Sequence, residues 1–305
     1  MELKELLVIS GKGGTGKTSL VGAFAALAEN KVLADCDLDA ADLHLLLRPQ
    51  IRETKEFYGS QKAVLDRERC NGCGVCVNVC RFRAISIDSG RRDNVPQATV
   101  RIDPISCEGC AVCSHACPQG AITMADNLSG HLFISDTPYG PLVHAKLGVA
   151  EENSGKLVTQ VRREARTIAE ERGLDYIITD GPPGIGCPVI SSISGVDLAL
   201  VVTEPTVAGS HDMERILQLA RHFDVNAMVC INKYDLDESK AEEIERYCRD
   251  KGIRVVGKIP FDEEVVNALA RGAPVVVPPG SAAQTEGKAS RAIRVIWTEV
   301  SSCLK

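Results

Sequence analysis

A glycine-rich loop near the start of the chain limits the possible folds more than any other stretch of the sequence. The loop, residues 11–18, has the spacing Gly-x4-Gly-Lys-Thr. It follows the apolar run 6–9 and precedes residues 20–28, whose apolar side chains recur at helical spacing. A strand, a loop of this spacing and a helix together are typical of a phosphate-binding loop. The glycines let backbone N–H groups curve around a polyphosphate, and the helix adds its positive dipole end.

The loop predicts a specific set of nucleotide-binding residues. These are Gly11, Lys12, Gly13, Gly14, Thr15, Gly16, Lys17, Thr18 and Ser19. In a loop of this kind the lysine at the position of Lys17 reaches the β- and γ-phosphates, and the hydroxyl of Thr18 binds Mg²⁺. We therefore expect ATP and Mg²⁺ as cofactors, with Lys17 among the catalytic residues.

The loop also carries a second lysine, Lys12, directly before two glycines. This pattern resembles the deviant Walker A signature of the MinD/ParA ATPase family, which includes the nitrogenase iron protein and the Mrp-type iron–sulfur carriers. In that family the second lysine reaches the nucleotide site of the partner subunit. The resemblance implies that Lys12 is catalytic and that the protein forms an ATP-dependent homodimer around two ATP molecules.

The resemblance extends to residues at the ends of later strands. Asp37, after the short strand 31–35, resembles the family's switch I residue that positions the attacking water. Asp180 ends the apolar run 176–179 and, with Gly184, resembles Walker B followed by switch II. The resemblance implies that Asp180 holds the Mg²⁺ shell and that the N–H of Gly184 senses the γ-phosphate. It also assigns adenine recognition to Asn232 and Pro260.

Two cysteine motifs interrupt this pattern. Residues 70–80 and 107–117 both read C-x2-C-x2-C-x3-C, and they lie 37 residues apart. This duplication is typical of a two-cluster bacterial ferredoxin, in which the fourth cysteine of each motif ligates the other cluster. The two predicted ligand sets for [4Fe–4S] clusters are therefore Cys70, Cys73, Cys76 and Cys117, and Cys107, Cys110, Cys113 and Cys80.

A pair of structural zinc sites is the alternative use of eight cysteines. The duplicated spacing, Pro118 after the last cysteine, and the matching apolar segments 84–87 and 121–124 favour clusters. Arg81 departs from the ferredoxin pattern, in which proline usually follows the fourth cysteine, but it removes no ligand. Cys187 follows Asp180 by seven residues, at the offset of a cluster ligand in the nitrogenase iron protein, although a structural or reactive thiol is the preferred interpretation.

Composition excludes several classes of function. The net charge is −6 and aromatic residues make up 4% of the chain, which argues against nucleic acid as a partner. No apolar run has the length of a membrane span, so stable membrane insertion is not expected. Thirteen cysteines without a secretory signal indicate metal ligation in a reducing compartment, and we expect a cytoplasmic protein.

The order of motifs predicts an α/β protein with an insert. We expect a doubly wound, mostly parallel P-loop sheet of the MinD type, in two parts at 1–57 and 131–305, with a small α+β ferredoxin domain at 58–130. In the second part the sequence predicts strands at 198–203, 227–231, 254–257 and 274–277. It predicts helices at 209–222, 238–251, 263–271 and 286–303.

Three functional hypotheses follow. The first is an ATP-hydrolysing, redox-active dimer that couples ATP-driven switching to electron transfer or metallocofactor assembly, with a redox or cofactor-assembly protein as partner. The second is an iron–sulfur scaffold or carrier resembling Mrp. The third is a positioning ATPase of the MinD type. Eight dedicated cysteines favour the first hypothesis over the second, and the lack of an evident membrane-targeting tail counts against the third.

Overall fold

The chain packs into two units. The computed structural model describes residues 2–38, 40–92, 95–148, 151, 154–276 and 287–305. Unit 1 comprises Met1–Lys55, Leu132–Lys146 and Ser154–Lys305, and unit 2 comprises Glu56–His131 and Leu147–Asn153. Residues 147–153, which the sequence assigned to the second part of the ATPase domain, therefore belong to unit 2.

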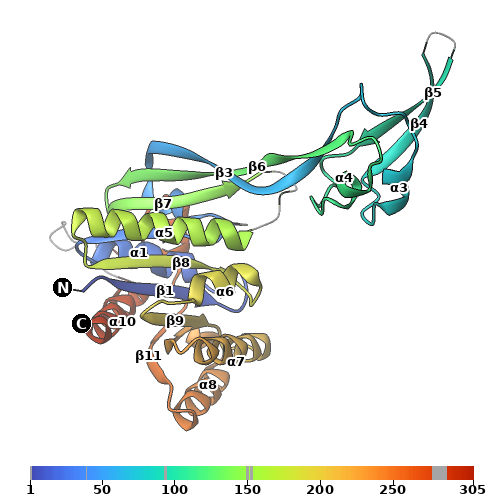
Figure 1. Ribbon diagram of the computed structural model, residues 1–305. Coiled ribbons are helices and arrows are strands. Elements are labelled where there is room, and N and C mark those ends of the chain that lie inside the picture. The colour runs from blue at the N-terminus through green and yellow to red at the C-terminus, as the bar shows by residue number, and fades with distance from the viewer. Residues whose placement is uncertain (1, 39, 93–94, 149–150, 152–153, 277–286) are drawn as a thin grey trace. The chain divides into compact units, whose positions relative to one another are not determined.

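A nine-stranded sheet runs in the order β11-β10-β9-β1-β8-β2-β7-β6-β3. Figure 1 shows β7, β8, β1, β9 and β11 following one another in that order. The strands are β1 Lys4–Ser10, β2 Lys31–Asp35, β3 Gln50–Leu65, β6 Ile122–Thr137, β7 Gly140–Leu147, β8 Tyr176–Pro183, β9 Leu198–Thr203, β10 Asn226–Asn232 and β11 Arg254–Ile259. Every pairing from β11 through β9, β1, β8 and β2 to β7 is parallel, which confirms the mostly parallel α/β fold.

Helices cover both faces of this sheet in unit 1. They are α1 Lys17–Leu27, α2 Leu43–Leu47, α5 Ser154–Arg172, α6 Cys187–Ile193, α7 Val207–His222, α8 Glu238–Asp250, α9 Glu263–Ala270 and α10 Lys288–Leu304, with the short 3-10 helix η1 Tyr234–Leu236. Alternate residues of β1 enter different cores: Leu6 and Val8 pack with α1 and α10, and Leu7 and Ile9 pack with α6, α7 and α8. Since successive side chains of a strand point to opposite faces, the sheet is doubly wound, as predicted.

The last helix docks on the core of unit 1. Ile293, Ile296 and Val300 of α10 are buried, and the Trp297 ring lies 5.0 Å from that of Phe24. No helix in the described part of the chain is both long and apolar enough to cross a bilayer.

One secondary-structure prediction was wrong. Residues 274–276 form no strand, because Pro274 has no N–H for a ladder, and the carbonyl of Val275 accepts a hydrogen bond from Ser290 Oγ at 2.9 Å. Residue 277 of that predicted strand and residue 286 of the predicted last helix lie outside the described residues. The long strand β3 and most of the long strand β6 were also missing from the predicted elements.

Unit 2 is a small α+β assembly with an internal repeat. Its short helices α3 Val75–Val79 and α4 Val112–Ala116 begin at equivalent places in the two cysteine motifs, and β4 Ile85–Arg92 pairs antiparallel with β5 Val95–Ile102. The residue before each helix, Gly74 or Ala111, has a positive φ, 75° and 62°. The two motifs thus share one backbone path as well as one spacing.

Candidate functional site

The glycine-rich loop lines a cavity of about 530 Å³ in unit 1. This volume lies within the usual range of small-molecule sites. The predicted binding residues that line the cavity are Gly13, Gly14, Thr15, Gly16, Lys17, Thr18, Ser19, Asp37, Asn232 and Pro260. Four other predicted site residues are not among the described residues that line this cavity: Gly11, Lys12, Asp180 and Gly184. Gly11 instead allows a close approach to α7, since a Cβ there would lie 2.2 Å from Cβ of Asp212.

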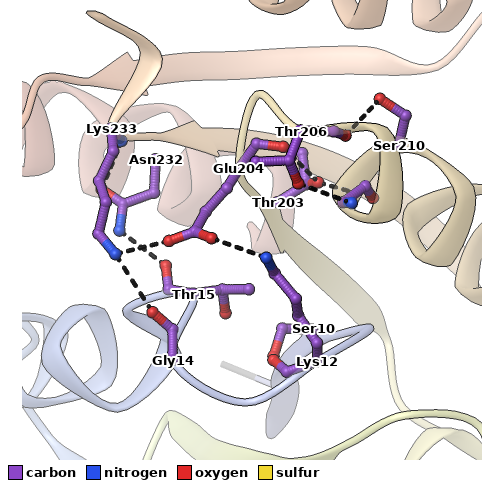
Figure 2. A network of polar contacts seen from close by, with 11 residues as sticks. Ser10, Lys12, Gly14, Thr15, Thr203, Glu204, Thr206, Ser210, Asn232 and Lys233 are labelled. Carbon is purple, nitrogen blue, oxygen red and sulfur yellow. Dashed lines mark hydrogen bonds and ion pairs between the residues drawn. The ribbon is translucent and has the colours of Figure 1, made fainter. Parts of the chain in front are cut away.

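Asn232 fastens the loop from the end of β10. Its Nδ2 donates a hydrogen bond to the carbonyl of Thr15 at 2.7 Å (Figure 2). The same nitrogen would be 2.3 Å from a Cβ at position 16, where the backbone has φ +87°. Gly16 is therefore required both by its left-handed backbone and by the asparagine packed against it.

Lys17 is held by two of the predicted catalytic carboxylates. Its Nζ lies 2.7 Å from Oδ1 of Asp180 and 3.2 Å from Oδ2 of Asp37, and all three side chains are buried. Burial alone would lower the pKa of Lys17, but the Asp180 and Asp37 carboxylates outweigh it and raise that pKa. Lys17 and the two carboxylates thus meet at one point, with Asp180 inside β8 and Asp37 two residues beyond β2.

A third carboxyl group, Asp35, belongs to the same cluster. Its Oδ1 accepts a hydrogen bond from the N–H of Asp37 at 3.1 Å. Burial, followed by the nearby Asp180 carboxylate, raises the pKa of Asp35 well above its ordinary value. Asp35, the last residue of β2, was not among the site residues predicted from the sequence.

Several buried oxygens in this region have no hydrogen-bond partner among the described residues. They are Oδ2 of Asp35, Oδ2 of Asp180, Oγ1 of Thr15 and Oγ1 of Thr179. Buried polar atoms in native proteins are nearly always hydrogen-bonded to protein or water. Carboxylate oxygens, often through water, are the groups that hold Mg²⁺. The donor set around Asp180 therefore fits a magnesium shell.

Lys12 pairs with a carboxylate of its own chain (Figure 2). Its Nζ lies 3.1 Å from Oε2 of Glu204, and Lys233 Nζ lies 2.5 Å from the other oxygen of the same group. Lys233 also donates to the carbonyl of Gly14 at 3.3 Å. Burial would raise the pKa of Glu204, but the two lysines outweigh it and lower that pKa, so the carboxylate is charged.

Sequence reasoning missed Glu204 and Lys233. Glu204 directly follows β9, and the rule that singled out Asp37 and Asp180, a carboxylate at the carboxyl end of a parallel strand, would have found it.

The N–H of Gly184 donates a hydrogen bond to the carbonyl of Ser10 at 3.1 Å. Cys187 is exposed at the start of α6.

Unit 2 gathers the eight motif cysteines around two small cavities. Cys70, Cys73, Cys76 and Cys117 line the first, and Cys80, Cys107, Cys110 and Cys113 line the second. One cysteine of each set is exposed: Cys73 in the first set and Cys110 in the second. Among the described residues, no group of three or more His, Cys, Asp or Glu side chains could hold a single metal ion.

Residues 6–275 match the family described as the CobQ/CobB/MinD/ParA nucleotide binding domain. The chain belongs to this family. An uncharacterized protein of Methanocaldococcus jannaschii is 31% identical over 272 residues, which cover 88% of each chain. The septum site-determining protein MinD of Bacillus subtilis is 27% identical over 139 residues, covering 44% of this chain and 48% of that protein. The match to the M. jannaschii protein is longer than unit 1, so it extends into unit 2.

Solved structures of the family share the fold. The MinD cell division protein of Aquifex aeolicus superposes with a TM-score of 0.54 at 21% identity, covering 98% of this chain and 97% of that chain. MinD of Pyrococcus horikoshii, solved as a complex with Mg-ADP, superposes with a TM-score of 0.54 at 14% identity, covering 98% and 96%. The MinD-like α/β prediction is thus confirmed as a fold.

Proposed function

We propose that this chain is a Mg²⁺-dependent ATPase of the MinD/ParA type in which unit 2 holds two [4Fe–4S] clusters. Nucleotide-driven dimer switching would be coupled to electron transfer or to metallocofactor assembly with a protein partner. The clusters would supply one-electron redox chemistry. The observation that carries the proposal is that the eight cysteines divide between two cavities as the ferredoxin pattern requires.

The nucleotide half of the proposal rests on the loop and the buried charges beside it. The backbone N–H groups of residues 13–18 would bind the polyphosphate, and Lys17 would exchange its carboxylate partners for phosphate oxygens. That exchange would release Asp180 to hold Mg²⁺ and Asp37 to orient the attacking water. The cavity continues past Asn232 to Pro260 and Phe261, where an apolar wall suits the adenine ring.

The cysteine arrangement supports clusters over zinc. Four thiolates on one zinc ion converge on a single point at about 2.3 Å each. The four thiolates of a cubane bind four different iron atoms, so they surround a cavity instead. Each set of four cysteines lines one cavity. Cys117 Sγ also accepts a hydrogen bond from the N–H of Ala121 at 3.3 Å, a contact that favours a charged sulfur.

A positioning ATPase without redox activity is the second candidate. The comparisons favour it, because several of the relatives are described as septum site-determining MinD proteins, among them that of Bacillus subtilis. Iron and sulfide content separates the two candidates. Protein purified anaerobically is expected to contain about eight iron and about eight acid-labile sulfide per chain. Stoichiometric zinc, or neither metal nor sulfide, would leave the positioning ATPase as the better proposal.

Coupling between nucleotide and clusters is the next expected result. A typical coupling free energy of about 1–3 kcal/mol between two sites corresponds to roughly 40–130 mV for a one-electron couple. We expect Mg-ATP to move at least one midpoint potential by tens of millivolts relative to Mg-ADP. The measurement is a redox titration followed by EPR with no nucleotide, with Mg-ADP and with a non-hydrolysable ATP analogue. Superimposable titrations in all three states would refute coupling.

Asp37→Asn is expected to bind ATP and form the dimer but to hydrolyse ATP about 100-fold more slowly, within the range for loss of a positioned acid–base group. The amide keeps the volume of Asp37 but cannot accept a proton or hold water in the same way. Steady-state phosphate release measures the rate, and Asp250→Asn, at the exposed end of α8, is the control. Equal turnover by both variants would remove Asp37 from the catalytic set.

A further inference from the structure

A lysine of β3 lies against the second cysteine motif inside unit 2. Lys62 has a side chain that is only 14% exposed, and its Nζ donates a hydrogen bond to the backbone carbonyl of Cys107 at 2.9 Å. Lysine side chains are rarely this buried unless they are paired. A positive charge therefore stands at the first cysteine of the motif that lines the second cavity.

The negative charge near this lysine is the carboxylate of Glu151. Oε1 of Glu151 lies 3.9 Å from Lys62 Nζ, at the long end of an ion pair. The other oxygen, Oε2, accepts a hydrogen bond from Asn127 Nδ2 at 2.8 Å, and Asn127 also contacts Ser60 and Ser129. Since the ammonium is closer to the Cys107 carbonyl than to Glu151, the carboxylate neutralises its charge only in part.

Lys62 is tied to the second cavity and not to the first. Its side chain lines neither cavity, but its Nζ hydrogen bond goes to the carbonyl of Cys107, a residue that lines the second one. The backbone of β3 also packs tightly on the second motif, because a Cβ on Gly109 would lie 2.1 Å from the carbonyl oxygen of Gln61. This contact fixes the strand, and hence the lysine, next to that motif.

We propose that Lys62 selectively raises the midpoint potential of the cluster held by Cys80, Cys107, Cys110 and Cys113, and that Glu151 opposes it. The inference rests on the proposed function, in which unit 2 holds clusters. Reduction adds one electron from an external reductant, forms and breaks no bond, and makes the cluster with its four thiolates one charge more negative. A buried ammonium stabilises that added charge.

The test is a redox titration of anaerobically purified Lys62→Gln, followed by EPR. At the parent midpoint, the ratio of reduced to oxidised second cluster is expected to fall at least about threefold, about 28 mV on the scale of 59 mV per tenfold change. The first cluster serves as the internal control and is expected to titrate as in the parent. Titration in a Cys73→Ser background, which retains only the second cluster, assigns the signals.

Three further variants sharpen the result. Lys62→Arg keeps the charge and is expected to restore the parent potential. Glu151→Gln removes the opposing charge and is expected to raise the second potential, which tests the proposal even if Lys62→Gln fails to fold. Arg67→Gln removes a positive charge that is exposed to solvent instead of buried, and it is expected to change little.

The outcomes distinguish this inference from the function on which it rests. Protein with no iron and no sulfide would overturn both. Protein loaded with two clusters would overturn the inference alone if the second potential is unchanged in both Lys62→Gln and Glu151→Gln. Equal shifts of both clusters would do the same, because they would reflect a general charge effect.

Discussion

Lys12→Ala is expected to bind ATP but to lose about 10³-fold or more in turnover, the range found when a cationic finger supplied by a partner is removed. Lys12 is not among the described residues that line the cavity, and it forms an ion pair with Glu204, whose other oxygen lies 2.5 Å from Lys233. The substitution therefore leaves Lys17 and the loop in place. Any large loss of turnover must come from outside the chain's own cavity.

The measurement compares three quantities for one preparation. These are steady-state phosphate release, the affinity for a fluorescent ATP analogue, and the mass in light scattering with and without ATP. Lys12→Ala is expected to lose ATP-dependent dimer formation and turnover together while keeping affinity. Lys17→Ala is expected to lose affinity, and Lys251→Ala, an exposed lysine after α8, is the charge-matched control. Turnover at the parent rate in Lys12→Ala would remove the basis for a shared active site.

The cluster of Lys17, Asp37 and Asp180 was predictable because parallel strands bring their carboxyl ends together at one edge of a sheet. Asp37 lies two residues after β2, Asp180 lies in the second half of β8, and Lys17 follows β1 across the glycine-rich loop. All three therefore lie toward the carboxyl ends of strands in one parallel sheet. Such ends meet at the same edge. This rule predicts which residues lie near one another but not which of them form ion pairs. The pairing of Lys12 with Glu204 therefore had to come from the structure.

The long strands β3 and β6 could not be predicted for a different reason. Most of the first residues of β3 are polar and exposed, so no period-two apolar pattern marks them as a strand. The assignment of residues 147–153 to unit 2 also depends on contacts distant in sequence, such as Asn127 with Glu151 at 2.8 Å. Local sequence patterns indicate which residues are buried. These segments are instead held in place by polar contacts, which such patterns do not indicate.

The cysteine motifs are the opposite case, because their spacing predicts a pairing that crosses between repeats. The sequence assigned Cys117 to the first set and Cys80 to the second, and those residues line the corresponding cavities. This exchange is the feature that a simple pair of separate four-cysteine sites would lack. Replacing a single cysteine therefore tests whether each set binds a cluster.

Cys73→Ser and Cys110→Ser are each expected to lose about half of the iron and sulfide, about four of eight atoms of each, with nucleotide affinity unchanged. Both residues are exposed and line different cavities, so serine at either position costs little packing while removing one ligand. Iron, sulfide and zinc analysis of anaerobic preparations measures the result. Cys303→Ser, exposed in α10, is the control for a thiol without ligand spacing. If either motif variant retains full iron and sulfide, that cysteine is not a ligand. If one variant loses all eight of each, the two sets do not load independently, and the exchange of Cys80 and Cys117 binds them into one assembly.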